Sequence, residues 1–278
     1  SDLRGGLAGG ASLGAAGLAT PPEQLGRQIF LPGREGTLQI EMLAGARRNG
    51  ALAIEIPGSL DALLRETAAG QPVVVLLNLG LSWAPSWHYA VVIGYDLDEA
   101  AFLLRSGPIE RQVLPFETLE RTWARGGNWA FVVLPPGKLA ASAGETQTTT
   151  ALVAFEKTAP PLRAATAYRS ALERWPGSLT LAMGLGNSLY KAGALPEAET
   201  VFKNAARRHD AAAAWNNLAN LLLERGRLRE ARDAAQKAVA LGGPTLDTAQ
   251  DTLRQIEARL TASASPRRKA PRDRAARR

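Results

Sequence analysis

A repeated helical pattern in the second half of the chain constrains the fold more than any other feature. Two stretches recur thirty-three residues apart: Leu185-Gly186-Asn187-Ser188-Leu189 followed by Ala198, Phe202 and Ala205, and Leu218-Ala219-Asn220-Leu221-Leu222 followed by Ala231, Ala235 and Ala238. Small residues at equivalent positions allow two antiparallel helices to approach closely, and Gly193 or Gly226 supplies the tight turn between them. Such in-phase repetition predicts an array of helix pairs in which each pair packs on the next.

The pattern resembles the tetratricopeptide repeat, and an earlier half-unit is visible at Ala164, Tyr168 and Ala171. We therefore expect an all-α repeat domain over residues 151–262. The residues expected to pack its helices are Leu185, Gly186, Ala198, Phe202, Trp215, Leu218 and Ala231. The resemblance implies a peptide or protein ligand, because stacks of this kind usually bind partners on one face. A purely structural appendage is the alternative.

The first half of the chain mixes helical and strand patterns, which predicts an α+β domain over residues 1–136. Short apolar, β-branched runs predict strands at 71–78, 89–95, 102–105, 111–114 and 129–134. Helical patterns cover 37–48 and 59–67, and Ser59 is the expected N-cap of the second. Residues 137–150 begin with Pro-Gly and continue with small polar residues, so they are interpreted as a linker.

The candidate catalytic residue in the first half of the chain is a histidine, and the chain has no cysteine to pair with it. The chain has no cysteine and two histidines, and His88 opens an apolar strand in Ser82-Trp83-Ala84-Pro85-Ser86-Trp87-His88-Tyr89-Ala90-Val91-Val92-Ile93-Gly94-Tyr95-Asp96. A histidine at a strand start is most often structural. An imidazole there can instead face a nucleophile at the N-terminus of a helix, where the helix dipole lowers the pKa of a thiol.

This run and its surroundings resemble the papain-like cysteine peptidases of the bacteriocin-processing type. More narrowly, they are similar to bacterial proteins that join such a domain to C-terminal tetratricopeptide repeats. The resemblance implies the missing nucleophilic cysteine near Arg4, the catalytic imidazole at His88 and the third triad member near Ser106. It also implies a peptide cleft near Trp83 and Trp87. A serine can hydrogen-bond an imidazole but does not stabilise an imidazolium as a carboxylate does.

The resemblance therefore implies a cysteine-peptidase homologue that is inactive or truncated, because loss of a triad nucleophile costs orders of magnitude in rate. Whether the chain is an enzyme stays open. Ser82, Ser86 and Ser106 lack the Gly-x-Ser-x-Gly context of a serine hydrolase. A single histidine without cysteines disfavours a metal site, and no phosphate-binding loop is present. No cofactor is expected. The alternative function is a non-enzymatic scaffold whose repeats recruit a partner protein.

Charge is concentrated at the C-terminus. Residues 265–278 carry seven of the basic residues and one aspartate, which accounts for most of the net charge of +7. We interpret residues 263–278 as a disordered basic tail; weak contact with nucleic acid or an anionic membrane is the alternative. No apolar run is long enough to span a membrane, and no signal-peptide pattern is present. Relatives are often exported or membrane-attached, so the compartment stays open.

Overall fold

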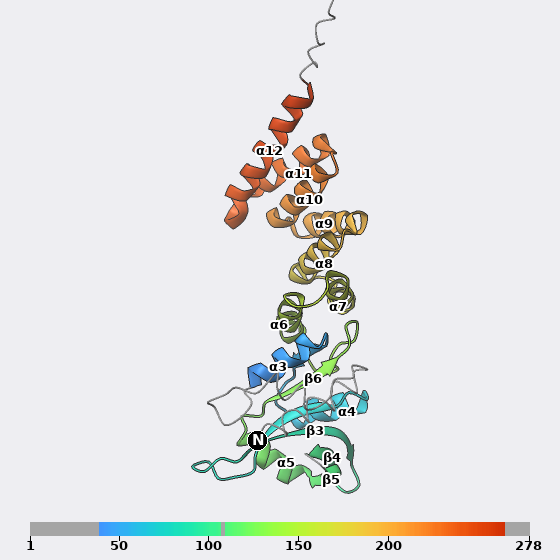
Figure 1. Ribbon diagram of the computed structural model, residues 1–278, viewed down its shortest axis with the longest axis vertical. Coiled ribbons are helices and arrows are strands. Elements are labelled where there is room, and N and C mark those ends of the chain that lie inside the picture. The colour runs from blue at the N-terminus through green and yellow to red at the C-terminus, as the bar shows by residue number, and fades with distance from the viewer. Residues whose placement is uncertain (1–38, 107–108, 265–278) are drawn as a thin grey trace, which may run out of the picture. The chain divides into compact units, whose positions relative to one another are not determined.

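The computed structural model describes residues 39–106 and 109–264 (Figure 1). By compactness the chain divides into two units, residues 1–192 and 193–278. The first unit holds a mixed α/β region and three helices of the helical region, and the second holds the remaining helices. The expected succession of an α/β region and an all-helical region is confirmed. The predicted domain boundaries at 136 and 151 stay a prediction.

A six-stranded antiparallel sheet forms the centre of the first unit. Its strands run in the order β1 (Leu52–Glu55), β6 (Ala130–Leu134), β2 (Val73–Asn78), β3 (Trp87–Asp96), β4 (Ala101–Ser106) and β5 (Ile109–Pro115). Every residue of β2 is buried, as expected for a short run of valine and leucine in the middle of a sheet. The five predicted strands are confirmed. The sixth, β1, pairs with β6 from Leu52↔Leu134 to Glu55↔Phe131.

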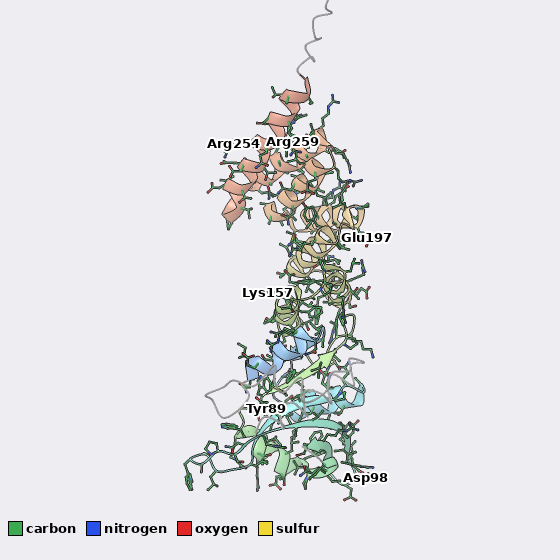
Figure 2. All side chains as sticks on the ribbon, in the orientation of Figure 1. Tyr89, Asp98, Lys157, Glu197, Arg254 and Arg259 are labelled. Atoms are coloured by element: carbon green, nitrogen blue, oxygen red, sulfur yellow. The ribbon has the colours of Figure 1, made fainter. Side chains whose placement is uncertain are left out.

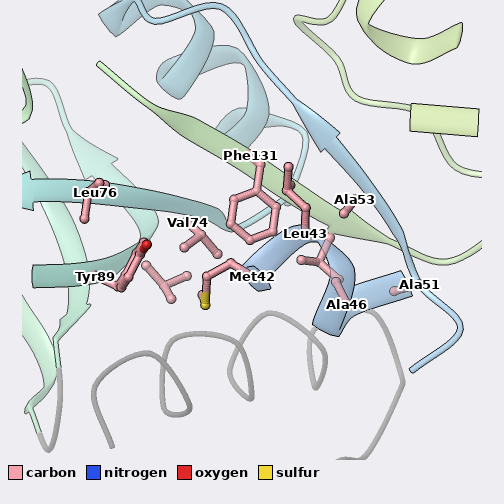
Figure 3. Packing of buried hydrophobic residues seen from close by; sticks show 11 residues of the cluster. Met42, Leu43, Ala46, Ala51, Ala53, Val74, Leu76, Tyr89 and Phe131 are labelled. Carbon is pink, nitrogen blue, oxygen red and sulfur yellow. The ribbon is translucent and has the colours of Figure 1, made fainter. Parts of the chain in front are cut away.

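Within the described part of this region, three helices accompany the sheet: α3 (Gln39–Arg48), α4 (Leu60–Ala68) and α5 (Phe116–Ala124). Figure 3 shows the core between α3 and the sheet, where Met42, Leu43 and Ala46 face Val74, Tyr89 and Phe131. The helix α4 begins as predicted, because the Ser59 hydroxyl accepts a hydrogen bond from the Ala62 N–H at 3.2 Å. The helix α5 was not predicted from the sequence.

The segment after β6 differs from the predicted linker. Residues 145–150 form the start of helix α6 (Glu145–Glu156), in which Thr148, Leu152 and Phe155 are buried. The Gln147 side chain accepts a hydrogen bond from the Gly144 N–H at 2.9 Å, which caps the helix start. Threonine lowers helix propensity, but tertiary packing outweighs such small preferences. The interpretation of residues 145–150 as an unpatterned linker was therefore wrong.

Residues 139–142 are held by side chains from two helices and the turn after α4. The buried Glu66 carboxylate accepts hydrogen bonds from the N–H of Ala141, at 3.0 Å, and from the N–H and hydroxyl of Ser142. The Gln71 amide donates to the Leu139 carbonyl. From helix α7 (Pro161–Arg174), Arg174 donates to the Ala140 carbonyl at 2.7 Å. The connection between the sheet and the first helices is thus fixed by side chains within one compact unit.

The helical region is confirmed as an array of helix pairs. After α7 come α8 (Leu179–Lys191), α9 (Leu195–His209), α10 (Ala212–Glu224), α11 (Leu228–Leu241), the 3-10 turn Gly243–Thr245 and α12 (Leu246–Ala264). Gly193 and Gly226 both adopt positive φ in the turns before α9 and α11, as the repeat pattern predicted. Between residues 39 and 264, leaving aside 107–108, no helix is long and apolar enough to cross a membrane.

Close packing of α7 on α8 depends on one glycine. A Cβ atom added at Gly184 would lie 2.3 Å from the ring of Tyr168, which is itself fully buried. The Tyr168 hydroxyl donates to the Glu156 carboxylate at 2.6 Å. Burial is the main cause that raises the pKa of the phenol, and this hydrogen bond is the second. The predicted packing residues of the repeats are all buried: Leu185, Gly186, Ala198, Phe202, Trp215, Leu218 and Ala231.

Candidate functional site

The structure brings His88 and Ser106 together. His88 is the second residue of β3 and Ser106 is the last residue of β4, the neighbouring strand. The His88 Nε2 and the Ser106 Oγ lie 2.7 Å apart, a hydrogen bond between partly buried side chains. The two residues are eighteen positions apart in the chain, so the antiparallel register of β3 and β4 creates the contact.

This pair can orient an imidazole but supplies no charge to it. The Ser106 hydroxyl either donates to the neutral Nε2 or accepts from its N–H, and both arrangements fix the plane of the ring. The contact with Ser106 engages Nε2 of the ring. A hydroxyl gives an imidazolium less stabilisation than a carboxylate would. The thiol that such an imidazole would activate is absent from the chain.

The other residues predicted for this site are placed differently. Arg4 lies outside the described residues. Trp87 and His88 are consecutive in β3, so their side chains leave opposite faces of the sheet. Trp83 lies in the loop between β2 and β3 and is 83% exposed. Trp87 therefore does not share a sheet face with His88, and a peptide cleft near Trp83 and Trp87 stays a prediction.

A residue that the sequence reasoning missed organises the loop before His88. Asn78 is the last residue of β2 and is 2% exposed, and its side-chain Oδ1 accepts hydrogen bonds from the N–H of Gly80 and of Ser86. The Arg125 guanidinium donates twice to the Asn78 carbonyl. An asparagine between an apolar strand and a glycine is a typical turn signal, and it was available in the sequence.

The second unit contains a groove between two helices. Its floor is formed by Trp215, Leu218 and Leu222 of α10, and its walls come from α9 and α11. The groove holds about 170 Å³. Drug-sized ligands occupy pockets of roughly 300–1,000 Å³, so this groove suits a single side chain better than a cofactor. Trp215 and Leu218 had been predicted only as packing residues.

Charged side chains rim the groove in two groups. Arg225 and Arg227 both pair with Glu199, and Arg227 also pairs with Glu230. The hydrogen bond from Arg227 is the main cause that lowers the pKa of Glu230, so this carboxylate is ionised at neutral pH. The other group is Lys203, Asp233 and Lys237. The Lys237 ammonium lies over the Trp215 ring, 4.4 Å from its centroid.

Comparison with known proteins confirms the repeats. A family model described as tetratricopeptide repeat matches residues 161–208 and 196–244. No curated protein matches the chain significantly. A solved structure from Bacillus anthracis, described as a "putative C39-like peptidase", is similar over 49% of this chain and 90% of its own, at 19% identity and a TM-score of 0.39. The structure described as "MamA RS-1 ArsTM double mutant" is similar over 43% of this chain and 77% of its own, at 18% identity and a TM-score of 0.33.

Proposed function

We propose that this chain binds a peptide or a partner protein through its repeats, and that its N-terminal region is a cysteine-peptidase homologue that does not cleave. Tetratricopeptide repeats over residues 161–244 indicate protein binding. The observation that carries the proposal is the groove on α10, because it combines an apolar floor with charged groups on its rim. The absence of any cysteine supports a silent peptidase-like region.

The groove favours one anchoring side chain with an acidic neighbour. Trp215, Leu218 and Leu222 line the groove but are themselves mostly buried, so an inserted side chain would contact only their exposed edges. The carboxylates of Glu199 and Glu230 are already bound by arginines. That leaves two lysines, Lys203 and Lys237, against one carboxylate, Asp233. The expected ligand is therefore a peptide with an aromatic or aliphatic residue beside an aspartate or glutamate.

Reversal of the two lysine charges tests this proposal. Peptides selected from a displayed random library against the full chain are expected to bind the Lys203→Glu, Lys237→Glu double variant at least tenfold more weakly. The reason is that a favourable contact becomes a like-charge contact at the same position, and a factor of ten corresponds to about 1.4 kcal/mol. The matched control is Arg259→Glu on the exposed surface of α12 (Figure 2). Equal binding by all three proteins would place the ligand elsewhere and contradict the proposal.

A restored thiol tests the peptidase-like part separately. In an Arg4→Cys variant, the introduced thiol is expected to titrate well below its ordinary value of about 8.5, because an imidazolium at His88 would stabilise the thiolate. Alkylation rate against pH gives the pKa, and addition of His88→Ala is expected to return it to the ordinary value. An ordinary thiol in both proteins would show that Arg4 is not the nucleophile position. Labelling of Ser106 in the unmodified chain by a fluorophosphonate would contradict a silent site.

The scaffold alternative gives the opposite combination of results. A pure scaffold would keep peptide binding in the repeats, while the thiol introduced at Arg4 would be indifferent to His88. The 2.7 Å contact between His88 and Ser106 fits both readings, since any buried imidazole needs a hydrogen-bond partner, so the thiol titration decides between them.

A further inference from the structure

The loop between β2 and β3 carries an unusual concentration of exposed apolar side chains. In Figure 1 this segment leaves the sheet as a narrow extension between the two strands. Three large side chains on the loop, and a fourth at the first residue of β3, are exposed to solvent: Leu79 by 52%, Leu81 by 57%, Trp83 by 83% and Trp87 by 54%. Single exposed apolar residues are ordinary, but four within nine positions are a concentration of the kind that marks an interaction site.

Hydrogen bonds within the loop give it a defined conformation. The Asn78 Oδ1 ties the N–H of Gly80 and of Ser86 at 3.0 and 2.9 Å, and the Leu79 N–H donates to the Ser86 carbonyl at 2.9 Å. At the tip, the Ala84 N–H donates to the Leu81 carbonyl. A Cβ atom at Gly80 would lie 2.3 Å from the Ala84 oxygen, so the narrow root of the loop requires glycine there.

This internal bonding decides what kind of partner fits. Of the seven backbone N–H groups in residues 79–86, those of Leu79, Gly80, Ala84 and Ser86 donate within the loop, and Pro85 has none. The N–H groups of the three tip residues 81–83 have no backbone acceptor among the described residues. An unpaired N–H is costly in hydrocarbon but can donate to water and headgroup oxygens in the interfacial layer. The loop is therefore suited to the interfacial layer of a bilayer rather than to its hydrocarbon core.

The charge pattern points the same way. No Asp, Glu, Lys or Arg occurs from Leu79 to Tyr95. A cation lies at the root of the loop, where the guanidinium of Arg125 is held on the Asn78 carbonyl. An apolar tip rich in tryptophan above a cationic root matches the border between lipid chains and phosphate headgroups.

We infer that the β2–β3 loop inserts Leu79, Leu81, Trp83 and Trp87 into the interfacial layer of an anionic phospholipid bilayer, with Arg125 at the level of the phosphates. The loop then acts as a peripheral anchor, which neither the repeats nor the His88–Ser106 pair requires. Stable peripheral binding generally needs two weak signals, and here they are the apolar side chains of the loop and the guanidinium at its root.

The full chain is tested by co-sedimentation with vesicles of phosphatidylcholine alone or mixed with phosphatidylglycerol. The expected result is binding to the mixed vesicles that falls at least tenfold in a Leu81→Ser, Trp83→Ser double variant. The matched control is Leu97→Ser, which removes a leucine that is 66% exposed in the turn between β3 and β4. Brominated lipid is expected to quench the unmodified chain more strongly than a Trp83→Phe variant.

Two other results would overturn the inference. Unchanged vesicle binding by the double variant, lost on removal of residues 265–278, would mean that the basic sequence alone binds the membrane. Absence of vesicle binding would exclude the lipid surface. If sedimentation then showed self-association abolished by the double variant, the loop would be an interface between two copies. Because peptide binding to the repeats is measured separately, failure here leaves the proposed function untouched.

Discussion

Glu66→Ala is expected to lower the free energy of unfolding by about 3 kcal/mol, because it leaves hydrogen-bond donors unpaired in a closed site. The Glu66 carboxylate is fully buried and accepts from two N–H groups and one hydroxyl of Ala141 and Ser142. Among residues 39–106 and 109–264, these two N–H groups have no other acceptor. Denaturant unfolding followed by tryptophan fluorescence measures the change, provided that the dependence on denaturant is the same in both proteins.

Two controls identify the cause of this loss. Glu66→Gln keeps the shape and one acceptor oxygen, so an intermediate loss is expected. Glu120→Ala removes an exposed glutamate from α5 and is expected to change the free energy by less than about 0.5 kcal/mol. Faster hydrogen exchange at Ala141 and Ser142 in Glu66→Ala would locate the effect. Equal losses of free energy at positions 66 and 120 would show that the hydrogen bonds of Glu66 to Ala141 and Ser142 contribute no stability of their own.

The elements that the sequence predicted have strong local signals, and those it missed depend on distant contacts. The strands β2 and β3 are runs of valine, leucine and isoleucine, which few other structures accommodate. The strand β1 is only four residues long and reads Leu-Ala-Ile-Glu, so neither length nor alternation distinguishes it. It forms because β6 offers a complementary edge. The start of α6 likewise has a threonine-rich sequence and gains its stability from burial.

The candidate site was predictable only where it follows strand order. His88 lies at the start of β3 and Ser106 at the end of β4. Because these consecutive strands pair in antiparallel fashion, the two residues come to the same end of the sheet. The separation of Trp87 from His88 follows from the alternation of side chains in one strand, which the sequence also contains. The groove on α10 was not predictable in the same way. Its lining comes from α9, α10 and α11, so it depends on how these three helices pack.

The structure separates two classes of tryptophan, and this separation bears on function. Trp123 and Trp83 share a side chain but differ in exposure by almost the whole range, at 1% and 83%. A buried tryptophan stabilises the fold, because its apolar surface is removed from water and its N–H donates a hydrogen bond. A tryptophan that contacts mainly solvent, such as Trp83, contributes little to the stability of the fold. Replacing each of these two tryptophans by alanine therefore shows which of them contributes to the free energy of unfolding.

Trp123→Ala is expected to lower the free energy of unfolding by about 4 kcal/mol, within the range for emptying a large buried site. Trp123 is among the largest fully buried side chains, and its Nε1–H donates to the Trp129 carbonyl at 2.9 Å. Trp123→Phe keeps much of the volume but loses this donor, so a loss of about 2 kcal/mol is expected. Unfolding curves measure both. Trp83→Ala is the control, expected within about 0.5 kcal/mol. If Trp83→Ala destabilised as much as Trp123→Ala, the loop would be part of the core, and its role at a membrane surface would lose its basis.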